Sequence, residues 1–374
     1  ANALKTIITG NLPLDAISSG RMKEIMDLCL SCKACKAECP SNVDMAKLKY
    51  DFLSRYREAN GVTFRDMMLG NLDRLGVIGT ATHPISNWLM SSSPLKMLLD
   101  NIGIDSRRSL PKYAAKTFKA SIDSKKYRRL QKKPSPKGIV AIFNDTFTNY
   151  HNPEIGHSAI KILERLGYEV IVPNWSCCGR INLSVGDDQS AKMKAERNIE
   201  VAISALKIAD YIVGLEPSCI LSFKDEYLDL LPGNKDVISV AGKTILIDEL
   251  LMQDIETLKE FNLQKLPKTI LLQTHCHQKA ILGKDSSLLI LNSIPNCNVI
   301  ELNSGCCGMA GSFGFEKEHY ELSMSLGKMN LFDKINQHKQ DVEIVSMGTS
   351  CRQQIVDGTG RMPLHITELL LKII

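Results

Sequence analysis

The sequence has no long uncharged apolar run, and this absence excludes a membrane-spanning protein. No stretch approaches the roughly eighteen consecutive apolar residues that a spanning helix needs. An apolar signal segment and a fingerprint for binding a flavin or a nicotinamide are also missing. The 44% hydrophobic and 23% charged residues are typical of a globular protein, and 374 residues suffice for several domains. We therefore expect a multidomain protein in the cytoplasm, with the inner face of the membrane as the second option.

Cysteine is too scarce for a disulfide scaffold and too clustered to be incidental. The twelve cysteines are about 3% of the chain, against the roughly 8–10% of small disulfide-stabilised proteins. They fall in tight groups that include two adjacent Cys-Cys pairs, which is typical of metal ligands in a reducing compartment. We therefore expect these thiols to bind metal.

The strongest motif is a run of four cysteines and a proline near the N-terminus: Cys29, Cys32, Cys35, Cys39 and Pro40. Its spacing is that of bacterial ferredoxins, in which one tight turn directs three thiolates to an iron–sulfur cluster while the fourth cysteine points away. Zinc is the alternative, but four-cysteine zinc sites usually consist of two separated Cys-x2-Cys pairs. The run therefore predicts an iron–sulfur cluster.

The fourth cysteine of this run has two interpretations. In two-cluster ferredoxins it binds the other cluster, whose remaining ligands come from a second cysteine run. The sequence contains no second run. Cys39 therefore binds either the same cluster or one whose run lies upstream of Ala1, and a start at Ala1 rather than Met favours the second interpretation.

The second half of the chain is a tandem duplication. Three landmarks recur at offsets of 129 to 132 residues: 139–142 with 269–272, 177–179 with 306–308, and 217–219 with 349–351. Apolar strands alternate with amphipathic helices in both copies, which is typical of a parallel sheet. We expect two α/β repeats with small parallel sheets, at 137–262 and 263–374.

Two helical segments precede the repeats. Residues 1–60 are predicted to form helices around the cysteine run, and residues 61–136 a helical and basic connector. The connector helices are expected to break at four positions: Gly76, Gly79, Pro84 and Pro94. Residues 104–137 contain twelve Lys and Arg but two Asp, so this segment carries +10 and the rest of the +5 chain carries −5. We expect a solvated connector that can dock on an acidic partner domain. Since few aromatic residues and no nucleic-acid fold motif accompany the charge, nucleic acid is not an expected partner.

In the second repeat four thiols follow the predicted strands: Cys276, Cys306, Cys307 and Cys351. Each is expected at the end of a strand, and open α/β sheets bind ligands at the carboxyl ends of their strands. Adjacent strand residues point to opposite faces, so Cys306 and Cys307 need an irregular loop, which the flanking Gly305 and Gly308 allow. These four cysteines are the candidate ligands of a second centre.

Other polar residues lie near this centre in the sequence. In a strand, His275 and His277 would point away from the thiol of Cys276. We interpret them as hydrogen-bond donors to the ligands, with an exposed surface pair as the alternative. Cys297 has no counterpart in the first repeat and is interpreted as an incidental thiol.

The first repeat offers three thiols: Cys177, Cys178 and Cys219. Thr146 stands where the second repeat has Cys276, and a threonine hydroxyl is a poor iron ligand at neutral pH. The fourth position would be filled by water, a substrate atom or a histidine such as His151 or His157. The site is either open and functional or degenerate and structural, because a copied fold does not by itself carry a site.

Taken together, four segments resemble the iron–sulfur oxidoreductases with cysteine-rich CCG domains: residues 29–40, 215–219, 275–279 and 305–314. This family includes the B subunit of heterodisulfide reductase, the C subunit of anaerobic glycerol-3-phosphate dehydrogenase and the iron–sulfur subunits of lactate and glycolate oxidases. More narrowly, the segments are similar to the C-terminal half of large FAD-linked oxidases that act on D-2-hydroxy acids such as D-lactate or D-2-hydroxyglutarate.

The resemblance implies an α+β multidomain fold, with a helical ferredoxin-like N-terminal segment followed by two duplicated α/β CCG domains. It implies [4Fe–4S] clusters that relay electrons from FAD, in an upstream domain of the same polypeptide, to a quinone or an electron-carrier protein. Peripheral membrane contact is a further option. The sequence departs from the full CCG pattern where Thr146, Glu216 and Gly348 replace cysteines, so the non-cubane clusters of heterodisulfide reductase are not expected.

Two other functions stay open. A thiol–disulfide reductase of the heterodisulfide reductase type would use an open cluster at Cys177, Cys178 and Cys219. A zinc-stabilised binding protein would be colourless and would bind nucleic acid in a salt-dependent way.

Overall fold

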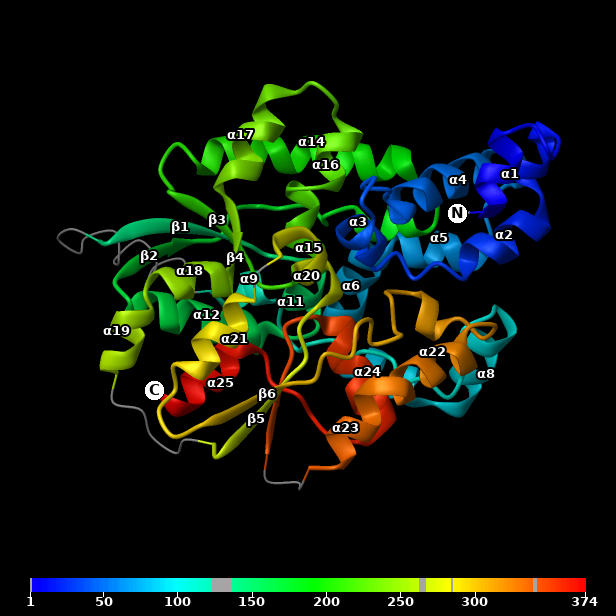
Figure 1. The fold of residues 1–374 in the computed structure, drawn as a ribbon. Helices are drawn as coiled ribbons and strands as arrows, with labels where there is room; N and C mark the ends of the chain where they lie inside the picture. The colour runs from blue at the N-terminus through cyan, green and yellow to red at the C-terminus, as the bar shows by residue number, and fades with distance from the viewer. Residues whose placement is uncertain (1, 123–135, 262–266, 284, 339–341) are drawn as a thin grey trace.

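The N-terminal part of the chain is helical. The computed structural model describes residues 2–122, 136–261, 267–283, 285–338 and 342–374. Helices flank the first cysteine run, as the sequence predicts: α1 (Asn2–Ile8), η1 (Leu14–Ser18), α2 (Gly20–Asp27), α3 (Ala34–Glu38) and α4 (Met45–Asn60). These helices lie at one end of the molecule, and α3, within the run, packs against α20 (Cys276–Leu282) of the second repeat (Figure 1).

Four short helices connect this part to the first sheet: α5 (Phe64–Gly70), α6 (Leu72–Ala81), α7 (Ile85–Ser91) and α8 (Ser93–Asn101). The prediction that Gly76 and Gly79 break a helix is wrong, because α6 continues through both. A Cβ atom at Gly76 would lie 2.5 Å from the ring of Tyr150, and one at Gly79 would lie 2.3 Å from the ring of Tyr113. These glycines therefore allow two aromatic rings to pack directly on the helix backbone, whereas the two predicted prolines stand at helix starts.

The start of the basic segment is not a solvated connector. Arg108 is 1% exposed, and its guanidinium donates to Gly314 O, Gln354 Oε1 and Ser323 Oγ. It also forms an ion pair with Asp357 at 2.9 Å. The rigid guanidinium fork suits several acceptors from different elements, which explains why this charge is buried. The prediction is therefore wrong for Arg108, and residues 123–135, which carry six of the twelve basic side chains, lie outside the described residues.

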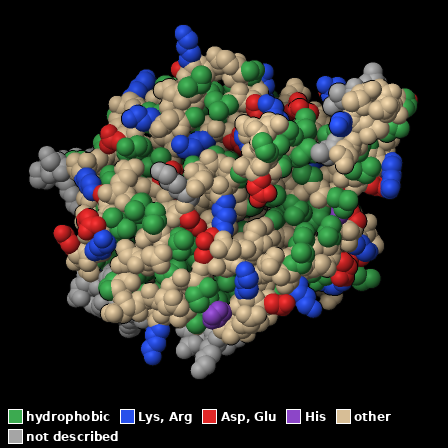
Figure 2. All heavy atoms as spheres, in the orientation of Figure 1, with side chains coloured by type: hydrophobic (Ala, Val, Ile, Leu, Met, Phe, Trp, Pro, Cys, Tyr) green, Lys and Arg blue, Asp and Glu red, His purple; other side chains and the backbone are tan. Residues whose placement is uncertain are grey.

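The surface mixes charge and apolar groups. On the face shown in Figure 2, Lys and Arg lie among Asp and Glu. Large apolar side chains are exposed along α5 to α8: Phe64, Met67, Val77, Ile78, Ile85, Trp88, Leu89, Met97 and Leu98. Within the described ranges, none of the helices has both the length and the apolar character needed to cross a membrane.

The first repeat contains a four-stranded parallel sheet in the order β2-β1-β3-β4. Its strands are β1 (Gly138–Phe143), β2 (Tyr168–Ile171), β3 (Tyr211–Gly214) and β4 (Thr244–Leu246). Its helices are α11 (Thr146–Tyr150), α12 (Pro153–Arg165), α13 (Arg180–Ser184), α14 (Asp188–Ala205), α15 (Pro217–Ile220), η2 (Leu221–Phe223), α16 (Glu226–Leu230), α17 (Lys235–Lys243), α18 (Ile247–Gln253) and α19 (Ile255–Glu260), with α9 (Phe118–Ser121) packed on α11 and α12.

The second repeat contains a three-stranded parallel sheet in the order β6-β5-β7. Its strands are β5 (Thr269–Leu272), β6 (Asn298–Glu301) and β7 (Glu343–Val345). Its helical elements are α20, α21 (Ser286–Asn292), η3 (Phe313–Phe315), α22 (Tyr320–Gly327), η4 (Lys328–Phe332), α23 (Asp333–Asn336), α24 (Thr349–Thr359) and α25 (Ile366–Ile373). The order β6-β5-β7 repeats β2-β1-β3, so the predicted duplication with small parallel sheets is confirmed.

The two repeats share one hydrophobic core. Helix α25 packs on α12 of the first repeat, and α18 packs on α21 of the second. Their buried side chains form one cluster with both sheets. The loops after β3 and β7 also meet, because Glu216 Oε2 accepts a hydrogen bond from the backbone N–H of Thr349 at 2.7 Å. The cysteine-bearing carboxyl edges of the two sheets are thereby brought together.

Candidate functional site

One cavity joins cysteines from three parts of the chain. It has a volume of about 280 Å³ and lies between the N-terminal helices and the carboxyl edges of both sheets. Eight thiols line it: Cys29, Cys177, Cys178, Cys219, Cys276, Cys306, Cys307 and Cys351. Three more cysteines of the N-terminal run lie outside its lining: Cys32, Cys35 and Cys39. Cys297 also lies outside it, just before β6.

The four second-repeat thiols gather at the carboxyl edge of their sheet, slightly beyond the predicted strand ends. Cys276 is the first residue of α20, and Cys351 lies in the first turn of α24. Cys306 and Cys307 lie in the loop after β6, and the flanking glycines have φ values of +68° and +92°. The loop therefore has the irregular backbone that two adjacent ligands need.

These four thiols form a chain of contacts that runs Cys276, Cys306, Cys307, Cys351. Contact with Cys306 and then burial raise the pKa of Cys276 well above its ordinary value. The backbone N–H groups that follow these residues partly oppose this rise in pKa at Cys276, Cys306 and Cys307. Packed together without a cation, such thiols stay protonated, so a positively charged metal centre is the natural partner of this set.

The first-repeat site has a parallel construction. Its thiols form the shorter chain Cys177, Cys178, Cys219, and the hydroxyl of Thr146 contacts Cys177. Thr146 is the first residue of α11, as Cys276 is of α20, so the two positions correspond in space as well as in sequence. This site therefore has three thiols and a hydroxyl at the cavity wall.

The structure does not support a histidine as fourth ligand of this site. His151 Nδ1 lies 3.0 Å from Lys112 O, and its ring stacks on Tyr113. His157 Nε2 lies 2.8 Å from Ser121 Oγ. Neither histidine lines the cavity. Of the three options for the fourth position, the histidine is therefore wrong, because closeness to Thr146 along the chain does not bring these imidazoles to the sheet edge.

The start of the N-terminal run forms part of the cavity wall, through Cys29, Leu30 and Ser31. Cys29 follows α2, and Cys35 Sγ accepts from the backbone N–H of Met45 at 3.4 Å. Burial raises the pKa of Cys32, and Cys276 is one of the neighbouring thiols that add to this rise. Cys39 has a different environment, in which the backbone N–H groups of residues 43 and 41 lower the pKa of its thiol.

Buried ion pairs hold this run against the first repeat. Lys33 lies between Cys32 and Cys35, has a φ of +62° and is 2% exposed. Its ammonium pairs with Asp225 and lies 2.9 Å from Glu226 Oε1. Burial opposes ionisation of Glu226, but Arg180 and Lys33 hold the pKa of its carboxyl well below its usual range.

His275 and His277 are buried in the site. They belong to the N-cap and first turn of α20 rather than to a strand, and each is 4% exposed, so the surface-pair alternative is wrong. His275 Nδ1 accepts from the backbone N–H of His277, and burial lowers the pKa of His275 to about 4. Burial and then the charge of Arg180 lower the pKa of His277 well below its ordinary value. Both imidazoles are therefore neutral near pH 7.

Glu216 and Gly348, at positions where the resemblance implies cysteines, make structural contacts instead. Glu216 is buried, accepts from Ser218 at the start of α15 and bridges to Thr349 of the second repeat. A Cβ atom at Gly348 would lie 2.3 Å from the ring of His275. The first position therefore joins the repeats, and the second makes room for an imidazole.

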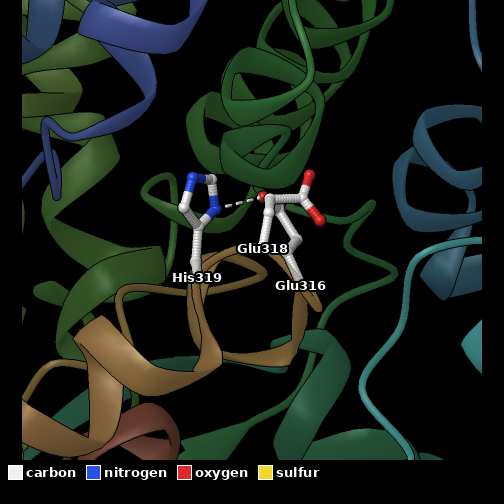
Figure 3. Close-up of side chains that lie close together, drawn as sticks. All are labelled: Glu316, Glu318 and His319. Atoms are coloured by element: carbon white, nitrogen blue, oxygen red, sulfur yellow. Dashed lines mark hydrogen bonds and ion pairs between the residues drawn. The ribbon is translucent and has the colours of Figure 1, made fainter.

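Glu316, Glu318 and His319 are the one group of three potential metal ligands among the described residues whose ligand atoms all lie within 4.8 Å of one another (Figure 3). His319 Nδ1 lies 2.8 Å from Glu316 Oε2, and Glu318 pairs with Arg65 at 2.8 Å. His319 also stacks on Phe313. Each of the three side chains therefore already has a polar partner in the protein: His319 and Glu316 each other, and Glu318 the side chain of Arg65. We interpret the group as structural contacts beside the cavity rather than as a metal site.

Comparison with known proteins identifies the family. The family model described as "Cysteine-rich domain" (CCG) matches residues 140–224 and 270–356, one range in each repeat. The C subunit of anaerobic glycerol-3-phosphate dehydrogenase from Escherichia coli (strain K12) is 30% identical over 331 residues, covering 88% of this chain and 80% of that protein. The chain belongs to the CCG family of cysteine-rich oxidoreductase proteins.

Other relatives of this CCG protein differ in length. D-2-hydroxyglutarate dehydrogenase from Escherichia coli (strain K12) is 22% identical over 365 residues, which cover 95% of this chain but 35% of that enzyme. Lactate utilization protein A from Oceanobacillus iheyensis is 27% identical over 248 residues, covering 62% of this chain and 96% of that protein. The predicted resemblance to CCG oxidoreductases is confirmed, and the identity is higher with the glycerol-3-phosphate dehydrogenase protein than with the longer enzyme.

Proposed function

We propose that this CCG protein is an electron-transfer module with two [4Fe–4S] clusters. One cluster would be bound by Cys29, Cys32 and Cys35, in a ferredoxin-like helical segment. The other would be bound by the four second-repeat thiols: Cys276, Cys306, Cys307 and Cys351. The observation that carries the proposal is one cavity lined both by Cys29 of the N-terminal run and by all four second-repeat thiols.

The spacing of the sulfurs supports a cluster over a single zinc ion. Zinc binds thiolates at about 2.3 Å in a tetrahedron, which places its sulfurs roughly 3.8 Å apart. Among the described residues, no three cysteine sulfurs lie within 4.8 Å of one another. The thiols instead form an open chain of contacts, so no three of them make the compact set that a single zinc ion needs.

The protein's own groups suit a change of charge at this centre. The clusters, when bound, would store and release single electrons. Backbone groups next to Cys276, Cys306 and Cys307 lower the pKa values of these thiols against the effect of burial, and so favour negative charge at the sulfurs. Arg180 places a fixed cation at the cavity wall. Cys307 and Cys351 are buried and the other proposed ligands are partly buried, which limits access of water.

We also propose an electron donor, an electron acceptor and a cellular location for this module. Electrons would come from a flavin, either in an upstream domain or on a separate chain, because the relatives include both a longer enzyme and one part of a dehydrogenase made of several chains. They would pass to a quinone or an electron-carrier protein. The apolar side chains exposed on α5 to α8 support peripheral contact with the inner face of the membrane from the cytoplasm.

Metal analysis of the anaerobically purified protein tests the main proposal. Two clusters predict about eight iron atoms and as many sulfides per chain, with a broad brown absorbance. Replacing Cys276 with serine should lower the iron content, whereas the matched variant Cys297→Ser should not. A colourless protein without iron would refute the proposal.

The first repeat favours one further function. Cys177, Cys178 and Cys219 line the same cavity, with Thr146 in place of a fourth thiol, so a small disulfide could reach an open coordination position there. Such a thiol–disulfide reductase would show substrate-dependent spectral changes. Full disulfide-cleaving activity after replacement of Cys177 and Cys178 by serine would rule this function out.

A further inference from the structure

The imidazole of His277 connects the two proposed cluster sites. His277 directly follows Cys276 in the first turn of α20. Its Nε2 lies 2.9 Å from the carbonyl oxygen of Ser31, and Ser31 directly precedes Cys32 in the N-terminal run. One side chain therefore links a ligand candidate of the second repeat with the backbone beside a ligand candidate of the run.

The neighbouring groups indicate which ring nitrogen of His277 carries the hydrogen and which group accepts it. A carbonyl oxygen only accepts, so Nε2 must carry the hydrogen and donate it to Ser31. The guanidinium of Arg180 lies 3.0 Å from the same nitrogen and can only donate, so a bond from it would need the other tautomer. We assign the hydrogen to Nε2, because Arg180 has Glu226 and Tyr50 as acceptors whereas the oxygen of Ser31 would otherwise face a lone pair. Within the described residues, His277 Nδ1 is buried without a hydrogen-bond partner. The bond to Ser31 is therefore the directional contact that orients the ring.

Arg180 completes the support around His277. Its guanidinium pairs with Glu226 of the first repeat and donates to Tyr50 Oη of α4 at 2.8 Å. Lys33 pairs with the same Glu226. The run is thus held on one side by charges of the first repeat and on the other by His277 of the second.

We propose that His277 is a positioning residue that holds the N-terminal cysteine run against the second repeat and so sets the rate of electron exchange between their two centres. The inference rests on the proposed function. In the exchange step one centre loses one electron and the other gains it, with no bond made or broken and no proton required. His277 acts through the backbone of the run and is not itself a ligand.

Two matched substitutions test this role. The amide of His277→Gln reaches the position of Nε2 and can still donate to Ser31, whereas the amide of His277→Asn is one methylene shorter and cannot. We expect H277N to slow electron exchange about ten- to a hundredfold and to weaken the magnetic interaction between the reduced clusters. We expect H277Q to stay within about threefold of the wild type, because it keeps the hydrogen bond.

The measurements use the full chain, purified anaerobically with its clusters. Exchange is followed by absorbance after flash photoreduction, and the magnetic interaction by electron paramagnetic resonance of the reduced protein. Should H277N fail to retain its clusters, His277→Phe, which fills the same space without a donor, takes its place. Tyr50→Phe removes a different bond of the Arg180 network and should exchange at the wild-type rate.

Three results would overturn the inference. Exchange in H277N or H277F could be as fast as in the wild type, H277Q could be as slow as H277N, or Y50F could be as slow as both. The first result would show that the bond has no effect, and the others that general packing sets the rate. A wild-type protein without iron would instead refute the proposed function.

Discussion

Lys33 is the residue whose loss should free the N-terminal cysteine run from the first repeat. Its side chain is 2% exposed and lies between the carboxylates of Asp225 and Glu226. Replacement by methionine keeps an unbranched stem but leaves these carboxylates without that cation. Removing one partner of a buried ion pair costs about 3–5 kcal/mol. Because Lys36 still pairs with Asp225, and Arg180 with Glu226, we expect the lower limit, about 3 kcal/mol.

Urea unfolding of the anaerobic protein, followed by circular dichroism and by visible absorbance, measures this change. The effect should be insensitive to added salt, because a buried pair is poorly screened. Lys47→Met is the matched control, since Lys47 pairs with Asp229 at the surface, where both side chains are over 40% exposed. That control should change stability by about 1 kcal/mol or less. An equally small effect of Lys33→Met would refute the reasoning, because it would mean that the carboxylates are not left buried.

Two further substitutions test the packing and the pH dependence of the fold. Gly76→Ala should destabilise the protein by about 1–3 kcal/mol in thermal or urea unfolding, because its Cβ would lie 2.5 Å from the ring of Tyr150, whereas Gly242→Ala meets nothing within 4 Å and should not. A harmless Gly76→Ala would contradict this packing. Burial raises the pKa of Asp248 to about 6 from an unfolded value of 3.8, so the folded state binds the proton more tightly and stability is lost as pH rises from about 4 through 6. The loss, about 3 kcal/mol by pH 8, should disappear in Asp248→Asn, and equal pH profiles of the two proteins would exclude it.

The sequence predicts the elements that depend on local pattern and repetition. Cys276 and Thr146 stand at matching helix starts because the duplicated strands place both just beyond a carboxyl end. The positive φ values of Gly305 and Gly308 agree with the irregular loop that the sequence predicts around the adjacent Cys306 and Cys307. These features can be predicted from the sequence, because each depends on residues close to it in the chain or on the repeat period.

The contacts that assemble the site left no such signal. Lys33 meets Asp225 across 192 residues, and His277 meets Ser31 across 246. A pair of opposite charges or one buried imidazole has no periodicity, so the sequence cannot show which distant partner it will meet. The same reason explains Arg108, which belonged to a basic run by composition but is buried against the second repeat.

The two repeats differ in what they offer the N-terminal run. After the Cys-Cys-Gly sequence the second repeat has Met309, which is fully buried, whereas the first has Arg180, which reaches Tyr50 of the N-terminal part. The first repeat also supplies the carboxylate of Glu226 that binds Lys33, but has Thr146 where the second has a fourth thiol. One copy of the duplicated sheet thus contributes mainly charges that hold the run, and the other the complete set of four thiols. A single α/β repeat, duplicated, therefore supplies both the charges that anchor the run and the four thiols of the proposed second centre, around one cavity.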